Sequence, residues 1–378
     1  MARSRSFDMG LQSLSREFIM KAFFSILCIL LVGLPCLSLA GTPNVDTLGD
    51  EKTATVFWKV ATLAPKGIGY SQRFADVLMP AIEKETKGDL AFKVYWGGSM
   101  GDDVQILQKM RLGQLDGAGL SGQGTFMMSP EIPILGLPFL FKDYHEVDHI
   151  KEMMIEDFDA LALRQGFKLL LWLDQDFDQI YSRSQPMDRM ENFRRVRFVT
   201  WFGPLEGRML ERMGASPIPI NVGEIPSAMR SGMADAMIAP AIWIVGTQLY
   251  TRIRFVNPMR IRYVPAFVVV TAKAFDAVPE HHRQTLSEKR LGLAYDFCRL
   301  SREDSEKSLV AMIAYGVKEV SPCEDELARM QAAVRPVWND LVDELYPRSL
   351  LERLLAHLDD FRARGNQAAG ECSQAFLE

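Results

Sequence analysis

The chain has 378 residues, of which 48% are hydrophobic and 24% charged, and its formal net charge is −5. This length is sufficient for two domains, and the excess of acidic side chains argues against nucleic acid as the main partner. Composition therefore indicates an ordinary globular protein, without identifying its function.

The N-terminal segment has the pattern of a secretory signal peptide. Lys21 precedes an apolar run, Ala22 to Ala40, that ends in small residues. We expect cleavage after Ala40, which makes residues 1–40 a signal peptide and predicts export of the protein, with no stable membrane insertion afterwards. A membrane anchor is the alternative, but the run barely reaches spanning length and Pro35 interrupts it. Met20 is an alternative start of translation.

Three cysteines follow the predicted cleavage site, at positions 298, 323 and 372. An odd number does not make a disulfide framework, although an exported chain can pair two of them. The sequence favours a Cys323–Cys372 pair, and three unpaired thiols are the alternative.

The first half of the chain alternates between strand and helix patterns. Strands are predicted over 55–63, 90–96 and 167–173, the last as a continuous apolar run typical of a strand covered on both faces. A helix is predicted from Tyr70 to Gly88, and another begins at Asp102. This alternation predicts α/β lobes with largely parallel sheets.

The C-terminal part is rich in helix formers. An almost unbroken pattern from Pro279 to Gly316 predicts one long helix, with or without a kink, and a second helical block covers residues 324–364. His281 and His282 fall in the polar start of the long helix, where we expect them to be solvated.

Two short segments, KMRLGQLDG (109–117) and AMRSGMADA (228–236), share the pattern Met-Arg-x-Gly-x-x-Asp. Each follows an amphipathic helix and precedes an apolar stretch, which predicts a helix, a glycine-assisted stop and a strand. The repeat suggests two lobes of similar construction, and chance similarity is the alternative for so short a match.

The segment HEVDH, His145 to His149, matches the pattern H-E-x-x-H, in which two histidines bind zinc and the glutamate acts as a base. An apolar stripe from Tyr144 to Met154 favours a surface helix instead, with both histidines toward its polar side. Asp148 is atypical of a zinc-protease helix, and no third ligand stands at a convincing spacing. A secreted zinc hydrolase is therefore the alternative function from a different class.

The segment RRVRFVTW, Arg194 to Trp201, concentrates three arginines at the start of a predicted strand. Alternation puts Arg195 and Arg197 on one face, and Arg197 is closest to the apolar part. We expect a half-buried Arg197 to bind an anion, because its planar fork matches a carboxylate. An internal salt bridge to a residue such as Glu224 is the alternative, and the two are compatible.

Three segments together resemble a known family. They are VATLAPKGIGYSQRFADV with the sequence that follows it to DGAGL, PEIPILGLPFLFKDYHEVDHI, and MENFRRVRFVTW through GASPIPINVGEIPSAMRSGMADAMIAP. They resemble the solute-binding proteins of tripartite ATP-independent periplasmic (TRAP) transporters, the DctP family. The resemblance runs from about Thr55 to Arg364.

This resemblance implies a periplasmic, non-enzymatic receptor without a cofactor, whose two lobes close on a small organic acid and deliver it to a TRAP membrane permease. The fold class is α/β, with a two-lobe periplasmic-binding-protein-like fold and a long helix spanning both lobes. Residues 41–175 plus about 264–302 would form lobe I, and residues 176–263 plus about 303–378 lobe II. The lobes would close about crossover strands near residues 175 and 263.

The resemblance also assigns site residues. Arg197 falls on the arginine that clamps the ligand carboxylate in the family, and Glu224 on a glutamate near that site. Trp201 and Trp243 could wall an apolar pocket, and Gln123 is a further candidate ligand contact.

Two departures from the family pattern bear on the ligand. Asp178, in DFDQIYS, stands where many members have a second ligand-binding arginine, and Ala239, in DAMIAP, stands where many have an asparagine. A second ligand carboxylate would be repelled. The expected ligand is thus a monocarboxylate with an apolar or aromatic body, with Asp178 accepting a hydrogen bond from it. A carrier of lipids or other hydrophobic ligands with the same fold is the remaining alternative.

Overall fold

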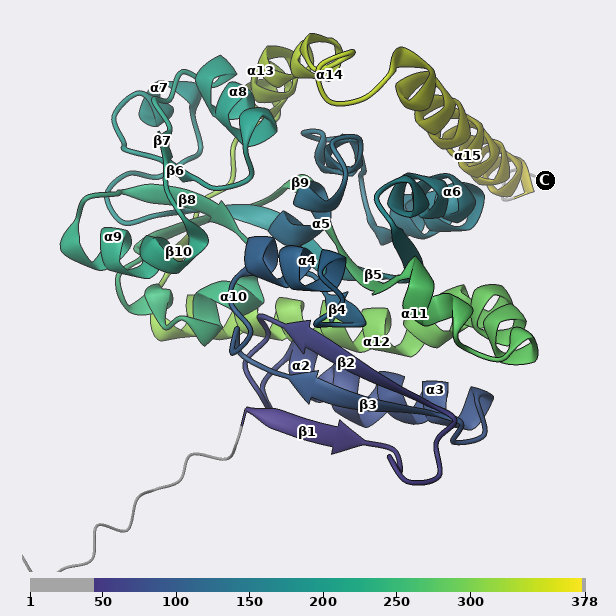
Figure 1. Ribbon diagram of the computed structural model, residues 1–378. Coiled ribbons are helices and arrows are strands. Elements are labelled where there is room, and N and C mark those ends of the chain that lie inside the picture. Colours follow the sequence, from purple (N-terminus) through teal and green to yellow (C-terminus); the bar gives the residue numbers. More distant parts are fainter. Residues whose placement is uncertain (1–43, 376–378) are drawn as a thin grey trace, which may run out of the picture. The chain divides into compact units, whose positions relative to one another are not determined.

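The fold is built around a mixed sheet of eight strands. The computed structural model describes residues 44–375, and their side chains as far as Gly365. The path of neighbouring strands is β1-β3-β2-β4-β9-β5-β8, with β10 paired to β9 (Figure 1). The strands are β1 (Val45–Leu48), β2 (Val56–Thr62), β3 (Leu90–Tyr95), β4 (Gly117–Gly119), β5 (Phe167–Ser182), β8 (Ala236–Ala239), β9 (Phe255–Thr271) and β10 (Lys318–Glu319), and a separate pair is formed by β6 (Val199–Thr200) and β7 (Ile218–Pro219).

The two long antiparallel strands β5 and β9 are shared between the two ends of this sheet. Near one end, β4 pairs with residues 268–270 of β9 and continues into the parallel pairs β4-β2 and β2-β3. Near the other end, β8 pairs with residues 179–182 of β5, and β10 pairs with the first residues of β9. The predicted lobe boundaries, at 175/176 and 263/264, fall inside β5 and β9, and the register of this pair shifts between Asp174 and Asp176. The boundaries themselves stay a prediction.

Helices cover the sheet and connect its strands. They are α2 (Tyr70–Arg73), α3 (Met79–Glu85), α4 (Asp103–Arg111), α5 (Gly122–Met128), α6 (Tyr144–Arg164), α7 (Met190–Phe193), α8 (Pro204–Arg212), α9 (Ile225–Ser231), α10 (Ala241–Gly246), α11 (Ala272–Asp276), α12 (Glu280–Tyr315), α13 (Glu324–Val334), α14 (Val337–Asp340) and α15 (Arg348–Ala375), with a π turn η1 (Phe74–Leu78) and 3-10 turns η2 (Ile132–Gly136), η3 (Val222–Glu224) and η4 (Leu249–Thr251). The predicted strands at 55–63 and 90–96 are confirmed as β2 and β3. The predicted strand at 167–173 is the first half of the longer β5.

The long helix predicted from Pro279 to Gly316 is confirmed as α12, which is one continuous helix. It packs against β5, against α3 near one end of the sheet and against α10 near the other (Figure 1). Its length therefore lets a single rigid element contact both halves of the sheet, as the family resemblance implied.

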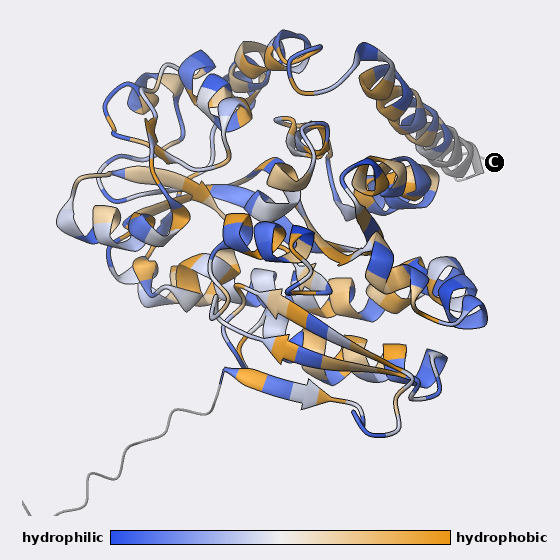
Figure 2. Cartoon of the chain, viewed as in Figure 1, coloured by the Kyte–Doolittle hydropathy of each residue, from blue (hydrophilic) through white to orange (hydrophobic). Residues whose placement is uncertain are grey.

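Amphipathic patterning decides how the helices pack. Apolar and polar residues alternate along α6 and α15, which pack against each other (Figure 2). In α6 the stripe formed by Val147, Ile150, Met154 and Phe158 is almost completely buried in the main hydrophobic core. The burial of such stripes against the sheet supplies most of the stability of these helices.

The repeated Met-Arg-x-Gly-x-x-Asp segment forms the same structure twice. Asp116 and Asp235 each follow a helix that ends near a glycine with positive φ, Gly113 (71°) in one copy and Gly232 (79°) in the other. The carboxylate of Asp116 accepts a hydrogen bond from the backbone N–H of Lys59, and that of Asp235 accepts one from Arg197. In return, the backbone N–H of Asp116 donates to the carbonyl of Lys59, and the backbone N–H of Asp235 donates to the carbonyl of Arg197. The repeated sequence pattern is therefore also a structural repeat, in which Arg197 occupies the position that Lys59 has in the first copy.

The predicted signal peptide, its cleavage site and the alternative start at Met20 lie outside the described residues. The proposed partner of Cys323 lies beyond the side chains that are described, so the pairing with Cys372 also stays a prediction.

Candidate ligand-binding site

A cavity of about 310 Å³ lies where the strands of the first half of the sheet end. Its wall includes the last residues of β2 and β4 with the residues that follow them, 62–65 and 119–121, together with side chains from α2, η1 and α10. Because the carboxyl ends of neighbouring parallel strands meet at one edge of a sheet, this edge is the usual position of a ligand in α/β folds. These loops are not among the site residues predicted from the sequence, although the predicted strand that is broken after Leu63 is a pattern typical of such a loop.

Close approach of α5 to β9 shapes one side of the cavity. A Cβ at Gly122 would lie 2.0 Å from a methyl carbon of Val264, so this position requires glycine. The Gly122 N–H donates a hydrogen bond of 2.5 Å to the side-chain carbonyl of Gln175, which also lines the cavity. The start of α5 is thereby fixed against the crossover strands.

Aromatic side chains form the other side. The rings of Trp201 and Trp243 stack with their centroids 6.0 Å apart, and Phe202 packs against Trp201. The backbone N–H groups of Trp201 and Phe202 donate to the buried carboxylate of Glu206, and Gln123 donates to the carbonyl of Trp201. Thus Gln123, Trp201 and Trp243, three of the residues expected at the site, do line one cavity.

A second, more open hollow adjoins this cavity, because Gln123 and Trp201 line both. Glu224 lines the second hollow and not the first. The glutamate expected beside the ligand is therefore a neighbour of the cavity and not part of its wall.

Arg197 lines neither hollow. Its side chain is 55% exposed and pairs with Asp235, at 2.7 Å from Nε and 3.1 Å from Nη2, and Nη2 also donates to the carbonyl of Gly232. The structure thus differs from the expected ligand clamp. It contains the alternative, an internal salt bridge, but with Asp235 and not with Glu224. The physical reason is the repeat described above, which holds the carboxylate of Asp235 directly beside the backbone of Arg197.

Asp178 and Ala239 are also absent from the wall of the cavity. Asp178 is completely buried, and its carboxylate pairs with the guanidinium of Arg262 at 2.7 Å, so it does not face a ligand. Ala239 is buried opposite Gln179 at the end of β8, although the following Pro240 does line the cavity. Sequence reasoning missed Arg262, because only the pairing of β9 with β5 brings it beside Asp178.

Two buried carboxylates of β5, Asp174 and Asp176, have pKa values that are shifted in opposite directions. Burial favours the protonated form of Asp174, but the ammonium of Lys151 at 2.6 Å and the guanidinium of Arg302 outweigh it and lower the pKa of Asp174 to about 2. Burial raises the pKa of Asp176 to about 7, because the donors to its carboxyl group from Ser305, Tyr144 and its neighbour's backbone are uncharged. Asp174 lines the cavity, yet its charge is already neutralised by two cations.

The HEVDH segment is structural in this arrangement. Glu146 is buried and pairs with Arg362, and Asp148 pairs with Arg302. The ring of His149 stacks on Phe361 at 4.6 Å. Within the described part of the chain, neither His145 nor His149 belongs to a group of three side chains placed to hold a metal ion. The geometry thus gives no support to a zinc site at this motif.

Comparison with known proteins agrees with this fold. The profile described as bacterial extracellular solute-binding protein, family 7 (DctP), matches residues 61–345. The chain belongs to the DctP family. The solved DctP-family structures that it resembles are two-lobe TRAP periplasmic solute-binding proteins, and the family is one of binding proteins.

Individual relatives are distant. An uncharacterized protein of Haemophilus influenzae is 23% identical over 55% of this chain, and the matched part spans 62% of that protein. The 2,3-diketo-L-gulonate-binding periplasmic protein YiaO of Escherichia coli is 22% identical over 66% of this chain and 76% of its own. A TRAP periplasmic solute-binding protein of Chromohalobacter salexigens, solved with bound D-glucuronate, has a TM-score of 0.72 at 20% identity and covers 80% of this chain and 99% of its own. At such identities the structural likeness shows the fold alone.

None of the helices among residues 44–375 is long and apolar enough to cross a membrane.

Proposed function

We propose that this protein is an extracytoplasmic receptor of a TRAP transporter that binds a small monocarboxylate with an apolar or aromatic body and delivers it to a membrane permease. The observation that carries the ligand class is the wall of the 310 Å³ cavity, which is predominantly apolar and includes the stacked pair Trp201 and Trp243. The protein would only bind and release its ligand, and no covalent bond would be made or broken.

The acid part of the proposal comes from relatives. YiaO is named for a sugar-acid ligand, and the Chromohalobacter salexigens structure holds glucuronate. Sugar acids carry several hydroxyl groups, and each would lose a hydrogen bond in an apolar wall. A ligand with an apolar body avoids this cost, and burial of its surface contributes about 25 cal/mol per Å².

The carboxylate would be held by neutral donors. Among the described residues, no lysine or arginine lines the cavity. The polar groups of the wall include the side-chain amide of Gln123 and the hydroxyl of Thr62, which can donate to a carboxylate. Arg197 would not contact the ligand, because its guanidinium pairs with Asp235 and lies outside the wall of the cavity.

Calorimetric titration with a panel of acids tests this function. We expect aromatic and branched-chain monocarboxylates to bind more tightly than glucuronate and succinate. Trp243→Ala should weaken binding of the best acid by about tenfold to a hundredfold, because it removes one face of the aromatic wall. Arg197→Ala is the matched control, and its affinity should change less than about twofold.

Tighter binding of glucuronate or succinate would refute the apolar ligand class. A large loss of affinity in Arg197→Ala would restore the arginine clamp expected from the family. If the purified protein releases a fatty acid or lipid on denaturation in mass spectrometry, a hydrophobic-ligand carrier replaces the proposal.

A further inference from the structure

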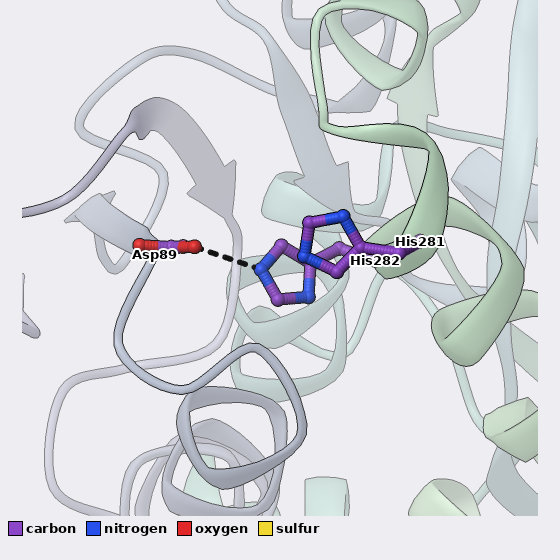
Figure 3. Close-up of side chains that lie close together, drawn as sticks. All are labelled: Asp89, His281 and His282. Atoms are coloured by element: carbon purple, nitrogen blue, oxygen red, sulfur yellow. Dashed lines mark hydrogen bonds and ion pairs between the residues drawn. The ribbon is translucent and has the colours of Figure 1, made fainter.

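The first turn of α12 meets the turn before β3 through two histidines and an aspartate. Nε2 of His282 lies 2.9 Å from Oδ2 of Asp89, and the rings of His281 and His282 lie with their centroids 3.9 Å apart (Figure 3). One potential ligand atom from each of the three residues lies within 4.8 Å of the others. In the described part of the chain, this is the only group of three histidine, cysteine, aspartate or glutamate side chains that is so close.

The three side chains differ in burial in a way that suits a binding site. The expectation that both histidines are solvated is wrong for His282, which is only 2% exposed and fixed in the core. His281 is exposed, and the side chain of Asp89 is 42% exposed. The site therefore has one rigid member and two that can adjust, and solvent can reach it.

Asp89 has hydrogen-bond partners other than the histidines, which anchor its backbone and orient its carboxylate. Its backbone carbonyl accepts a hydrogen bond from the N–H of Val56 at the start of β2, and its second carboxylate oxygen accepts one from the hydroxyl of Thr55. Such outer contacts orient a ligating carboxylate, as they do in protein metal sites.

The donor set selects a class of metal ion. Two imidazoles and one carboxylate suit Zn²⁺ and the neighbouring ions Co²⁺, Ni²⁺ and Cu²⁺, whereas Ca²⁺ and Mg²⁺ prefer sites made only of oxygen. In a tetrahedral zinc site the ligand atoms lie about 3.4 Å apart. Because the three ligand atoms lie within 4.8 Å of one another, a shift of at most about 1 Å by the two exposed side chains brings them to this spacing and leaves a fourth position for water.

We propose that Asp89, His281 and His282 form a binding site for a divalent transition-metal ion, with Zn²⁺ as the representative ion. The bound ion ties the turn before β3 to the N-terminal turn of α12, elements separated by about half of the chain. Because the ion binds the folded state, it raises the thermal stability of the protein. The site is distinct from the ligand cavity, none of whose wall it forms.

Zn²⁺ titration of the chain without its predicted signal peptide, and without an affinity tag containing histidine, tests the proposal. After treatment with a chelator, we expect one Zn²⁺ to bind per chain and to raise the melting temperature, while Mg²⁺ has no effect. His281→Ala and Asp89→Asn should each lower Zn²⁺ affinity by more than about 100-fold, since losing a direct ligand exceeds the loss seen for outer-shell partners. Both substitutions are at accessible side chains, which avoids disturbing the buried His282.

The matched control is a double variant of the other histidine pair, His145→Ala with His149→Ala, which should bind Zn²⁺ as the wild type does. The absorption of bound Co²⁺ would report the tetrahedral geometry and should disappear in His281→Ala. The proposal is overturned if the wild type binds no Zn²⁺, if His281→Ala and Asp89→Asn retain wild-type affinity, or if the control variant loses binding.

Discussion

The carboxyl group of Asp176 should make the stability of this protein fall as the pH rises toward neutrality. Burial raises its pKa from 3.8 to about 7 in the folded protein. Between these values the folded state keeps a proton that the unfolded state releases, so unfolding gains from a rise in pH. Below about pH 4 the two states hold the same proton and the group has no effect on stability.

The size of this effect follows from the difference in pKa. A difference of about 3 corresponds to about 4 kcal/mol of destabilisation above pH 7, and each pH unit within the window contributes about 1.4 kcal/mol. Asp176→Asn removes the titration and keeps the shape of the side chain. The amide oxygen can still accept one of the two hydrogen bonds that Tyr144 and Ser305 donate to the carboxylate, and loss of the other adds a cost that does not depend on pH.

Urea denaturation of both proteins between about pH 5 and pH 8 measures the difference directly. Relative to the wild type, the free energy of unfolding of Asp176→Asn should increase by about 3 kcal/mol over this range. Asp276→Asn, at a side chain that is 72% exposed, is the matched surface substitution. A difference between Asp176→Asn and wild type that stays constant with pH would refute the reasoning, because Asp176 would then be ionised in the folded state at all these pH values.

Two further substitutions test the buried supports of the cavity. Lys151→Met should lower the free energy of unfolding in urea by about 3 kcal/mol, because it removes one of the two cations that pair with the fully buried Asp174. Lys289→Met, which breaks an exposed ion pair with Glu85, is the control and should change the free energy of unfolding by less than about 1 kcal/mol. Equal effects would contradict the role of the buried pair. Gly122→Ala should cost about 1 to 3 kcal/mol, because its Cβ would overlap a valine methyl on β9, and Gly292→Ala in α12, where nothing lies within 4 Å, should stabilise by up to about 1 kcal/mol in thermal unfolding. A neutral Gly122→Ala would mean that α5 can move away from β9.

Local pattern was sufficient for most elements of the fold. The apolar run at 167–173, the acidic start of α4 at Asp102 and the unbroken helix formers after Pro279 each predict their element, because strand alternation and helix capping act over only a few neighbouring residues. In the structure Asp102 does cap α4 through the N–H of Gln105. The three segments that resemble the DctP family were together also sufficient to identify the family from the sequence.

Three of the residues that the sequence analysis proposes as ligand contacts, Trp201, Trp243 and Gln123, line one cavity, and their contact with a ligand stays a prediction. Their positions after a strand and at helix starts follow from local patterns, so a motif could point to them. A sequence motif could not show that the wall of the cavity lacks a lysine or arginine side chain.

Only the tertiary structure decided which charges pair with one another. Asp235 holds Arg197 away from the cavity, Arg262 neutralises Asp178 across the β5-β9 ladder, and His282 meets Asp89. Each pairing joins segments that are far apart in the chain, and their approach depends on how the whole sheet and α12 pack together. Sequence patterns report the period of an element and its buried face, but the partner of a long charged side chain is chosen by whichever opposite charge the folded backbone brings within a few ångströms.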